Sequence, residues 1–275
     1  MLSIDSYGLA KRVKYIKRTI ERLKPKVILE FGCGTGNNVL AHLAELFPDI
    51  GFVGVDSDCA SIEYARKNHK ARNLVFELPA ALEHYPRFDL IIATEVIEHV
   101  EEPDCFLRYL KEQLTKDGRL ILTLPNGYGP FEMASMIEGI LHLTGILPII
   151  RKVKLAVNRP RPGNTWRTDT LAISPHINFF STREIRRLIG ATGFKIAHQR
   201  PRTFLCGFGF DTLLRGQAIL SYNARVADYL PQVCTSGWMF LLEKQEEMPP
   251  GVYRYQRTFY ARWRKYLNLK RWKVK

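Results

Sequence analysis

Short apolar runs alternate along the chain with longer segments of helical periodicity. The runs are rich in β-branched residues and are bounded by glycine, proline or polar residues, as in strands buried on both faces. The segments between them carry apolar residues every three or four positions, as in amphipathic helices. We predict strands over residues 26–31, 51–56, 73–77, 88–94, 118–125, 193–199 and 235–245. We predict helices over residues 8–24, 38–47, 60–68, 103–114 and 181–192.

This alternation of strands and helices predicts an α/β domain with a mainly parallel sheet. We expect a Rossmann-like, doubly wound sheet of seven strands with helical insertions. The domain would occupy residues 1–245, interrupted at about 127–175 and 203–232 by segments too long for ordinary connections. We interpret these insertions as lids or substrate-shaping elements, and residues 246–275 as a basic, aromatic C-terminal tail.

A glycine-rich loop follows the first predicted strand. Gly32, Gly34 and Gly36 stand at every second position, directly after Glu30. In an open parallel sheet, ligands bind at the carboxyl ends of strands, and glycine lets a ligand come close to the backbone. The spacing is not the dinucleotide fingerprint G-x-G-x-x-G, because Asn37 stands in place of the third glycine. It is not a P-loop either, because the required lysine is missing.

The E-x-G-x-G-x-G spacing resembles the first motif of class I S-adenosylmethionine-dependent methyltransferases. The resemblance implies that the loop packs against S-adenosylmethionine and that Glu30 binds the ammonium of its methionine part, directly or through water. Asp56 ends the second predicted strand, and its carboxylate can accept hydrogen bonds from both ribose hydroxyls. We also expect Ser57 and Thr94 to contact the cofactor. The alternative is a tight turn in which Asp56 merely caps the following helix.

Two carboxylates and a histidine follow the fourth predicted strand. Glu95, Glu98 and His99 are spaced i, i+3, i+4, so a helix that begins at Thr94 would place them on one face. Such a group can bind a divalent cation, with Mg²⁺ or Zn²⁺ the favoured ions. The E-x-x-E-H pattern resembles that of ubiquinone-pathway O-methyltransferases. It is also similar to the small-RNA terminal 2′-O-methyltransferases, in which such a triad and a later histidine hold a metal.

The predicted metal ligands are therefore Glu95, Glu98 and His99, with His176 as the fourth, since it lies just before a predicted late helix. A bound ion would position a hydroxyl oxygen and lower its pKa, so that the oxygen attacks the methyl group. We predict His99 and Glu95 as catalytic residues. Without a metal, His99 would serve as the general base, because imidazole titrates near neutral pH, and Glu98 would be a solvated acid at a helix start.

The chain carries an excess of positive charge. It has 41 Lys and Arg against 27 Asp and Glu, a formal net charge of +14. Such a charge favours polyanions, either nucleic acid or an acidic membrane surface, although solubility alone is an alternative. Five scattered cysteines without a CxxC pair suggest reduced thiols in a cytosol-like compartment, and the basic amphipathic start of the chain does not resemble a secretory signal.

Two segments bear on the partner. Residues 136–163 join an apolar run to a basic one, and about fourteen apolar residues are fewer than the roughly twenty that span a bilayer. The run could lie on a membrane surface or form a lid helix. In the tail, the residues at helical spacing are Tyr255, Phe259, Trp263 and Leu267. The tail could dock on its own domain, stack on single-stranded nucleic acid, or bind an anionic interface.

We expect an S-adenosylmethionine-dependent methyltransferase that acts on a hydroxyl of a small-molecule or lipid-linked acceptor. We expect a cytoplasmic protein. As its polyanionic partner we favour an anionic membrane, contacted peripherally, over nucleic acid, because no RNA-binding module is recognisable. The alternatives are an RNA terminal ribose 2′-O-methyltransferase and a non-catalytic partner protein of the same fold. Intact Glu30, glycine loop and Asp56 argue against the second. The sequence predicts no oligomeric state.

Overall fold

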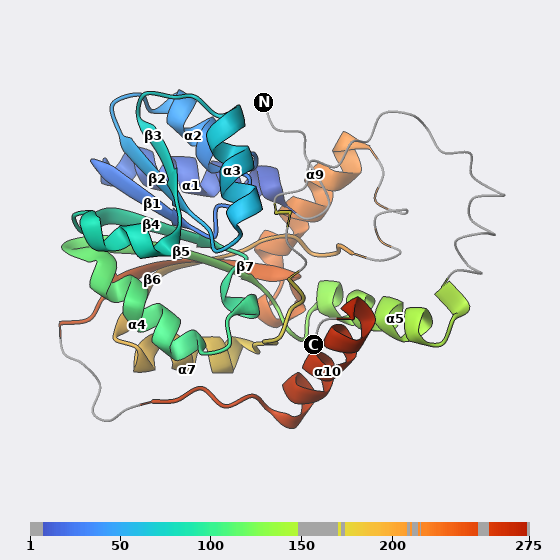
Figure 1. The fold of residues 1–275 in the computed structure, drawn as a ribbon. Coiled ribbons are helices and arrows are strands. Elements are labelled where there is room, and N and C mark those ends of the chain that lie inside the picture. The colour runs from blue at the N-terminus through green and yellow to red at the C-terminus, as the bar shows by residue number, and fades with distance from the viewer. Residues whose placement is uncertain are drawn as a thin grey trace.

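A seven-stranded sheet forms the centre of the molecule (Figure 1). The computed structural model describes residues 8–147, 170–171, 174–207, 210, 214, 216–246 and 253–273. The strands are β1 (Val27–Phe31), β2 (Gly51–Val55), β3 (Leu74–Glu77), β4 (Phe88–Thr94), β5 (Leu114–Pro125), β6 (Phe194–Pro201) and β7 (Gly237–Lys244). All seven lie where the sequence predicts them. Strand β5 begins earlier than expected because Leu114 already pairs with Phe88.

The strand order β3-β2-β1-β4-β5-β7-β6 makes the sheet doubly wound. Strands β1 to β5 run parallel, and only β7 is reversed, antiparallel to both β5 and β6. The order changes direction between β1 and β4, and Phe31 at the end of β1 lies opposite Val55 of β2 and Ala93 of β4. Ligands of such sheets bind at this switch point. The loops after β1, β2 and β4 therefore meet at one edge.

Helices cover both faces of the sheet (Figure 1). Those on one face are α1 (Leu9–Leu23), α2 (Leu40–Leu46) and α3 (Cys59–Asn68). Helices α4 (Pro103–Gln113) and α7 (Thr182–Ala191) cover the other. Ser181 and Glu184 form a capping box at the start of α7, which confirms the predicted serine cap. Burial of apolar side chains on both faces supplies the main stabilisation of the sheet.

The insertions carry their own helices. Helix α5 (Pro130–Leu143) occupies the start of the first, whereas residues 148–163 of the apolar and basic stretch lie outside the described part. The second insertion contains α9 (Gln217–Val226), η3 (Ala227–Tyr229) and η4 (Gln232–Cys234). The remaining 3₁₀ elements are η1 (Pro79–His84) and η2 (Ile97–His99). Among the helices described, none combines the length and the apolar character needed to cross a membrane.

The tail forms α10 (Phe259–Trp272), which lies beside α5 (Figure 1). Two residues of its predicted aromatic stripe do not face the domain, because Phe259 is 80% exposed and Trp263 40%. The buried face of α10 instead carries Arg264 and Asn268. The tail therefore docks on its own domain through polar side chains with buried partners and through Tyr255, which packs against Phe180, whereas Phe259 and Trp263 stay exposed.

Candidate active site

The loop after β1 requires glycine for two reasons. The backbone φ angles of Gly32, Gly34 and Gly36 are 77°, 53° and 72°, in the left-handed region that side chains disfavour. A Cβ on Gly32 would lie 2.4 Å from Cγ2 of Val96, and a Cβ on Gly36 would lie 2.7 Å from the ring of Phe76. The contact between Gly32 and Val96 places the turn after β4 directly against the glycine loop.

Asp56 lies against this loop. Its Oδ2 accepts a hydrogen bond from the backbone N–H of Gly34 at 2.8 Å, and its Oδ1 accepts one from the N–H of Asp58 at 2.9 Å. These bonds orient the carboxylate, and each oxygen keeps a lone pair for a donor such as a ribose hydroxyl. Asp58, not Asp56, caps α3, so the capping alternative for Asp56 is wrong.

The other predicted cofactor residues reach the same edge of the sheet. Glu30 is buried near the end of β1, and Thr94 is buried at the end of β4. Ser57 is exposed between Asp56 and α3. The structure thus gathers these residues around the glycine loop, and their contacts with the cofactor stay a prediction.

The turn after β4 differs from the predicted geometry. It is not helical from Thr94, because Glu95 has a left-handed φ of 56° and only Ile97–His99 form the short helix η2. The expectation of one helical face for Glu95, Glu98 and His99 is therefore wrong. A non-glycine residue in this conformation is strained by about 1–2 kcal/mol, so its surroundings must hold it in place.

Two arginines hold Glu95. Arg202 donates a short hydrogen bond to Oε2, Nη1 of Arg12 lies 3.4 Å from Oε1, and the hydroxyl of Thr123 donates to Oε1 at 2.8 Å. Burial alone would raise the pKa of Glu95, but the two guanidiniums outweigh it and hold this pKa at about 2. Glu95 is thus an ionised carboxylate with partners of its own. Its predicted catalytic and metal-binding roles remain untested.

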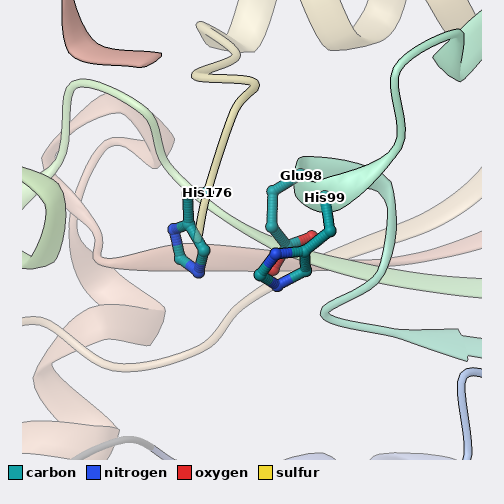
Figure 2. A group of neighbouring side chains, drawn as sticks. All are labelled: Glu98, His99 and His176. Carbon is teal, nitrogen blue, oxygen red and sulfur yellow. The ribbon is translucent and has the colours of Figure 1, made fainter. Parts of the chain in front are cut away.

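Glu98, His99 and His176 converge in space (Figure 2). One possible ligand atom from each lies within 4.8 Å of the others, and Glu95 does not belong to this group. The approach of His176 depends on the backbone, since the N–H groups of Ile177 and Asn178 donate to the carbonyl of Glu98 at 2.8 and 2.9 Å. Three of the four predicted metal ligands are therefore brought together.

Glu98 is the most unusual member of this cluster. Its side chain is fully buried, and neither carboxylate oxygen has a hydrogen-bond partner among the described residues. Burial, and secondarily the charge of Glu95, raise the pKa of Glu98 to about 8. A buried carboxylate without partners is costly, and such groups pair with cations or coordinate metals. The interpretation of Glu98 as a solvated acid is wrong.

Both imidazoles are oriented by a bond at Nδ1. Nδ1 of His176 lies 2.6 Å from Oε1 of Glu132, and Nδ1 of His99 lies 3.1 Å from the carbonyl oxygen of Pro175. The two ring centroids are 4.9 Å apart. In metal sites, such bonds fix the tautomer and leave the other ring nitrogen for the ion. Nε2 of each histidine is accordingly the candidate ligand atom.

The two histidines differ in their protonation. Burial, followed by the neighbouring His176, lowers the pKa of His99 to about 4, so this ring is neutral at neutral pH. Burial would lower the pKa of His176, but the charge and hydrogen bond of Glu132 outweigh it and raise this pKa to about 9. Because a metal binds neutral imidazole and ionised carboxylate, metal binding here would release protons from both His176 and Glu98.

Two residues of the site escape the sequence analysis. Glu132 belongs to the first turn of α5, and Arg264 of α10 donates to its Oε2 at 2.8 Å. The only signal for Glu132 is an acid at a helix start soon after a strand ends, which is common without function. For Arg264 there is none, because its periodicity places it beside an aromatic stripe that looks like the docking face.

The fold and the match to known families define the class of protein. The family described as "Methyltransferase domain" has a sequence model that matches residues 5–199 of the 275. The chain therefore belongs to this family, as the glycine-loop motif predicts. It has the Rossmann-like fold of class I S-adenosylmethionine-dependent methyltransferases, and membership of the family indicates S-adenosylmethionine as the cofactor.

Among its relatives are enzymes named ubiquinone biosynthesis O-methyltransferase. The one from Azorhizobium caulinodans is 28% identical over 231 residues, which cover 81% of this chain and 77% of the relative. The one from Pelagibacter ubique is 29% identical over 131 residues, 42% of this chain and 52% of the relative. The chain thus spans about half the length of the second relative.

A solved structure supports the fold alone. PKMT2 from Rickettsia typhi matches with a TM-score of 0.56 and 17% identity, over 95% of this chain and 57% of that one. At this identity, the likeness says nothing about the substrate.

Replacing Gly36 by alanine is expected to weaken the binding of S-adenosylhomocysteine by about tenfold or more. The new Cβ would strain the left-handed backbone by about 1–2 kcal/mol and press on Phe76. Isothermal titration calorimetry measures the affinity. Gly190→Ala in α7 is the control, because a Cβ there meets no atom within 4 Å. Equal affinity of Gly36→Ala and wild type would contradict the assigned role of the loop.

Arg202→Met is expected to lower the free energy of unfolding by about 2 kcal/mol, because the half-buried carboxylate of Glu95 loses a charge-assisted hydrogen bond. In the folded protein the pKa of Glu95 is about 2, below its ordinary value of 4.5. The stabilisation by Arg202 is therefore lost as the pH falls from about 4.5 towards 2. Urea denaturation at neutral and acidic pH measures it. Lys195→Met, in an exposed pair with Glu243, should change stability by less than about 1 kcal/mol. Similar losses of unfolding free energy in Arg202→Met and Lys195→Met would contradict the special role of the pair between Arg202 and Glu95.

Proposed function

We propose that this chain transfers the methyl group of S-adenosylmethionine to a hydroxyl oxygen of a lipid-like or lipid-linked acceptor, with a divalent cation held by Glu98, His99 and His176. The observation that carries the proposal is the buried carboxylate of Glu98, which no described residue hydrogen-bonds, beside two oriented imidazoles. Glu98 and His99 of this cluster follow closely after Val96, whose side chain packs on the glycine loop. The cofactor and the cation would therefore lie next to each other.

The donor atoms fit one kind of ion better than another. A carboxylate oxygen and two imidazole nitrogens suit Zn²⁺ or a similar transition metal, whereas Mg²⁺ prefers oxygen ligands throughout. Three protein ligands are typical of catalytic zinc sites, which keep a position open for water or substrate. We therefore favour Zn²⁺ over Mg²⁺.

Each part of the site has a task in methyl transfer. The glycine loop and Asp56 hold the donor, and the contact between Gly32 and Val96 fixes the turn after β4 beside it. When bound, the cation orients the acceptor hydroxyl and lowers its pKa. Glu98 would lose its proton to such an ion and then supply the negative charge that the ion needs. His99, which is neutral, has a ring nitrogen that can bind the ion or, without one, accept the hydroxyl proton.

An oxygen acceptor is favoured by the relatives. The enzymes from Azorhizobium caulinodans and Pelagibacter ubique are both named O-methyltransferases of ubiquinone biosynthesis. The E-x-x-E-H motif at Glu95–His99 resembles that of the same group. We carry over only the class of reaction, methylation of a hydroxyl, and not the acceptor.

A lipid-like acceptor is favoured by the surface of α5 and α10. On α5 the exposed apolar side chains are Met133, Ile137, Ile140 and Leu143. On α10 the exposed aromatic side chains are Phe259, Trp263, Tyr266 and Trp272, and the exposed cations are Arg262, Lys270 and Lys273. Aromatic and aliphatic residues beside cations are typical of helices at an anionic membrane interface. Aliphatic side chains offer nothing on which nucleic acid bases stack, so we favour membrane over RNA.

Methyl transfer to a lipid extract tests the proposal. With S-adenosylmethionine labelled in its methyl group, the label should enter organic-soluble products and not short RNA. Removal of metal by a chelator should abolish transfer, and Zn²⁺ should restore it better than Mg²⁺. Glu98→Gln should lose at least about 100-fold in rate, because the amide cannot replace the charge at the ion. Glu112→Gln, an exposed acid of α4, serves as the control.

Each contrary outcome has a meaning. Label in RNA instead of lipid would favour an RNA ribose methyltransferase. Full activity of Glu98→Gln would remove the metal from the mechanism. Cofactor binding without transfer to either fraction would favour a non-catalytic partner protein.

The membrane contact predicts that wild-type protein sediments with vesicles that contain anionic lipid. The double variant Phe259→Ala/Trp263→Ala should bind these vesicles about tenfold or more weakly, because it removes two aromatic side chains from the interface. Tyr229→Ala in η3 is the matched control, since Tyr229 is 90% exposed but far from α10 in sequence. The predicted membrane contact of α5 and α10 is wrong if wild type does not sediment with the vesicles. It is also wrong if Tyr229→Ala weakens binding as much as the double variant.

A further inference from the structure

A buried ion pair joins α10 to the candidate active site. Nη2 of Arg264 lies 2.8 Å from Oε2 of Glu132, and the two side chains are 0% and 1% exposed. The other oxygen of Glu132 accepts from Nδ1 of His176 at 2.6 Å. One carboxylate therefore bridges an arginine of the C-terminal helix and a predicted metal ligand.

Arg264 is held on several sides. Its Nη1 donates to the hydroxyl of Tyr260 at 2.8 Å, and its guanidinium lies 4.5 Å from the centre of the Phe179 ring. One turn further along α10, the amide of Asn268 donates to the backbone carbonyl of His176 at 3.0 Å. Helix α10 thus fixes both the side chain and the main chain of this histidine.

Stability alone does not explain this ion pair. Burial of two charges carries a large desolvation penalty, and well-packed apolar residues in the place of such a pair are often neutral or stabilising. Helix α10 nevertheless turns Arg264 inwards and leaves Trp263 and Phe259 exposed. A helix that served only to pack on α5 would gain more from the opposite arrangement.

We infer that Glu132 and Arg264 are positioning residues, which hold His176 so that its Nε2 faces Glu98 and His99. This inference rests on the metal site in the proposed function. Arg264 orients Glu132, and Glu132 in turn fixes the tautomer and the ring plane of His176. The C-terminal helix lies beyond residues 5–199, which match the family. The chain therefore completes its active site with a segment from outside the matched part of the domain.

Zinc binding to the full-length, metal-free protein tests the inference without an activity assay. Glu132→Gln keeps the shape of the side chain but loses its charge, and it should weaken zinc affinity by about 10–100-fold in calorimetry. The affinity for S-adenosylhomocysteine should stay that of wild type. The visible absorption bands of bound Co²⁺ should also differ between the two proteins, because the ligand field at His176 changes.

A double variant separates position from stability. In Glu132→Leu/Arg264→Met, both charges are removed, so its resistance to urea should equal or exceed that of wild type. Its zinc affinity should nevertheless fall by about 10–100-fold. The matched control is Glu138→Leu/Arg271→Met, which removes a second ion pair between the same two helices. That pair lies about two turns further along each helix than Glu132 and Arg264, so zinc affinity should not change.

The outcomes distinguish this inference from the metal proposal. If wild type binds zinc, Glu98→Gln does not, and both Glu132 variants bind like wild type, only the positioning role is overturned. If wild type binds S-adenosylhomocysteine but no zinc, the metal proposal and the positioning role fall together. Equal losses of zinc affinity in the two double variants would show a general effect of charge and would also overturn the inference.

Discussion

The docking of residues 177–178 on the turn after β4 is the contact on which the candidate site depends. Two backbone N–H groups donate to the carbonyl of Glu98, and the amide of Asn178 donates to the carbonyls of Ile97 at 3.0 Å and Val100 at 2.6 Å. These bonds satisfy the exposed carbonyls of a very short helix and bring a distant histidine to its side. Without them His176 would have no fixed relation to Glu98, and Glu132 and Arg264 would have nothing to orient.

A second constraint links this cluster to the cofactor loop. Val96 fills the space that a side chain at Gly32 would occupy, so the loop after β1 and the turn after β4 must fit together. The turn can adopt its shape only if Glu95 accepts a left-handed backbone, and the arginines around its carboxylate stabilise that conformation. The left-handed conformation of Glu95 thus sets the direction of the chain through the turn that carries Glu98 and His99. The observation fits the general tendency of strained residues to lie at functional sites.

The features of the fold and the site that sequence predicts are those with a local signal. The alternation of strands and helices predicts all seven strands. The spacing of the glycines predicts the cofactor loop, and the position of Asp56 at the end of the second strand predicts its place beside that loop. The geometry of Glu95 was mispredicted because helical spacing assumes a continuous helix, and a left-handed residue breaks that assumption. The contact between Arg264 and Glu132 joins positions far apart in the chain, and no periodicity reports it. The tail shows the same limit, since its period is helical as predicted but its buried face is the polar one.

The most direct measurement is X-ray absorption at the zinc edge on the zinc-loaded protein with S-adenosylhomocysteine bound. We expect two imidazole nitrogens at about 2.0–2.1 Å from the zinc together with carboxylate oxygen, and no sulfur. A spectrum with sulfur ligands, or with water oxygens alone, would contradict the claim that Glu98, His99 and His176 form a metal site beside the methyl donor.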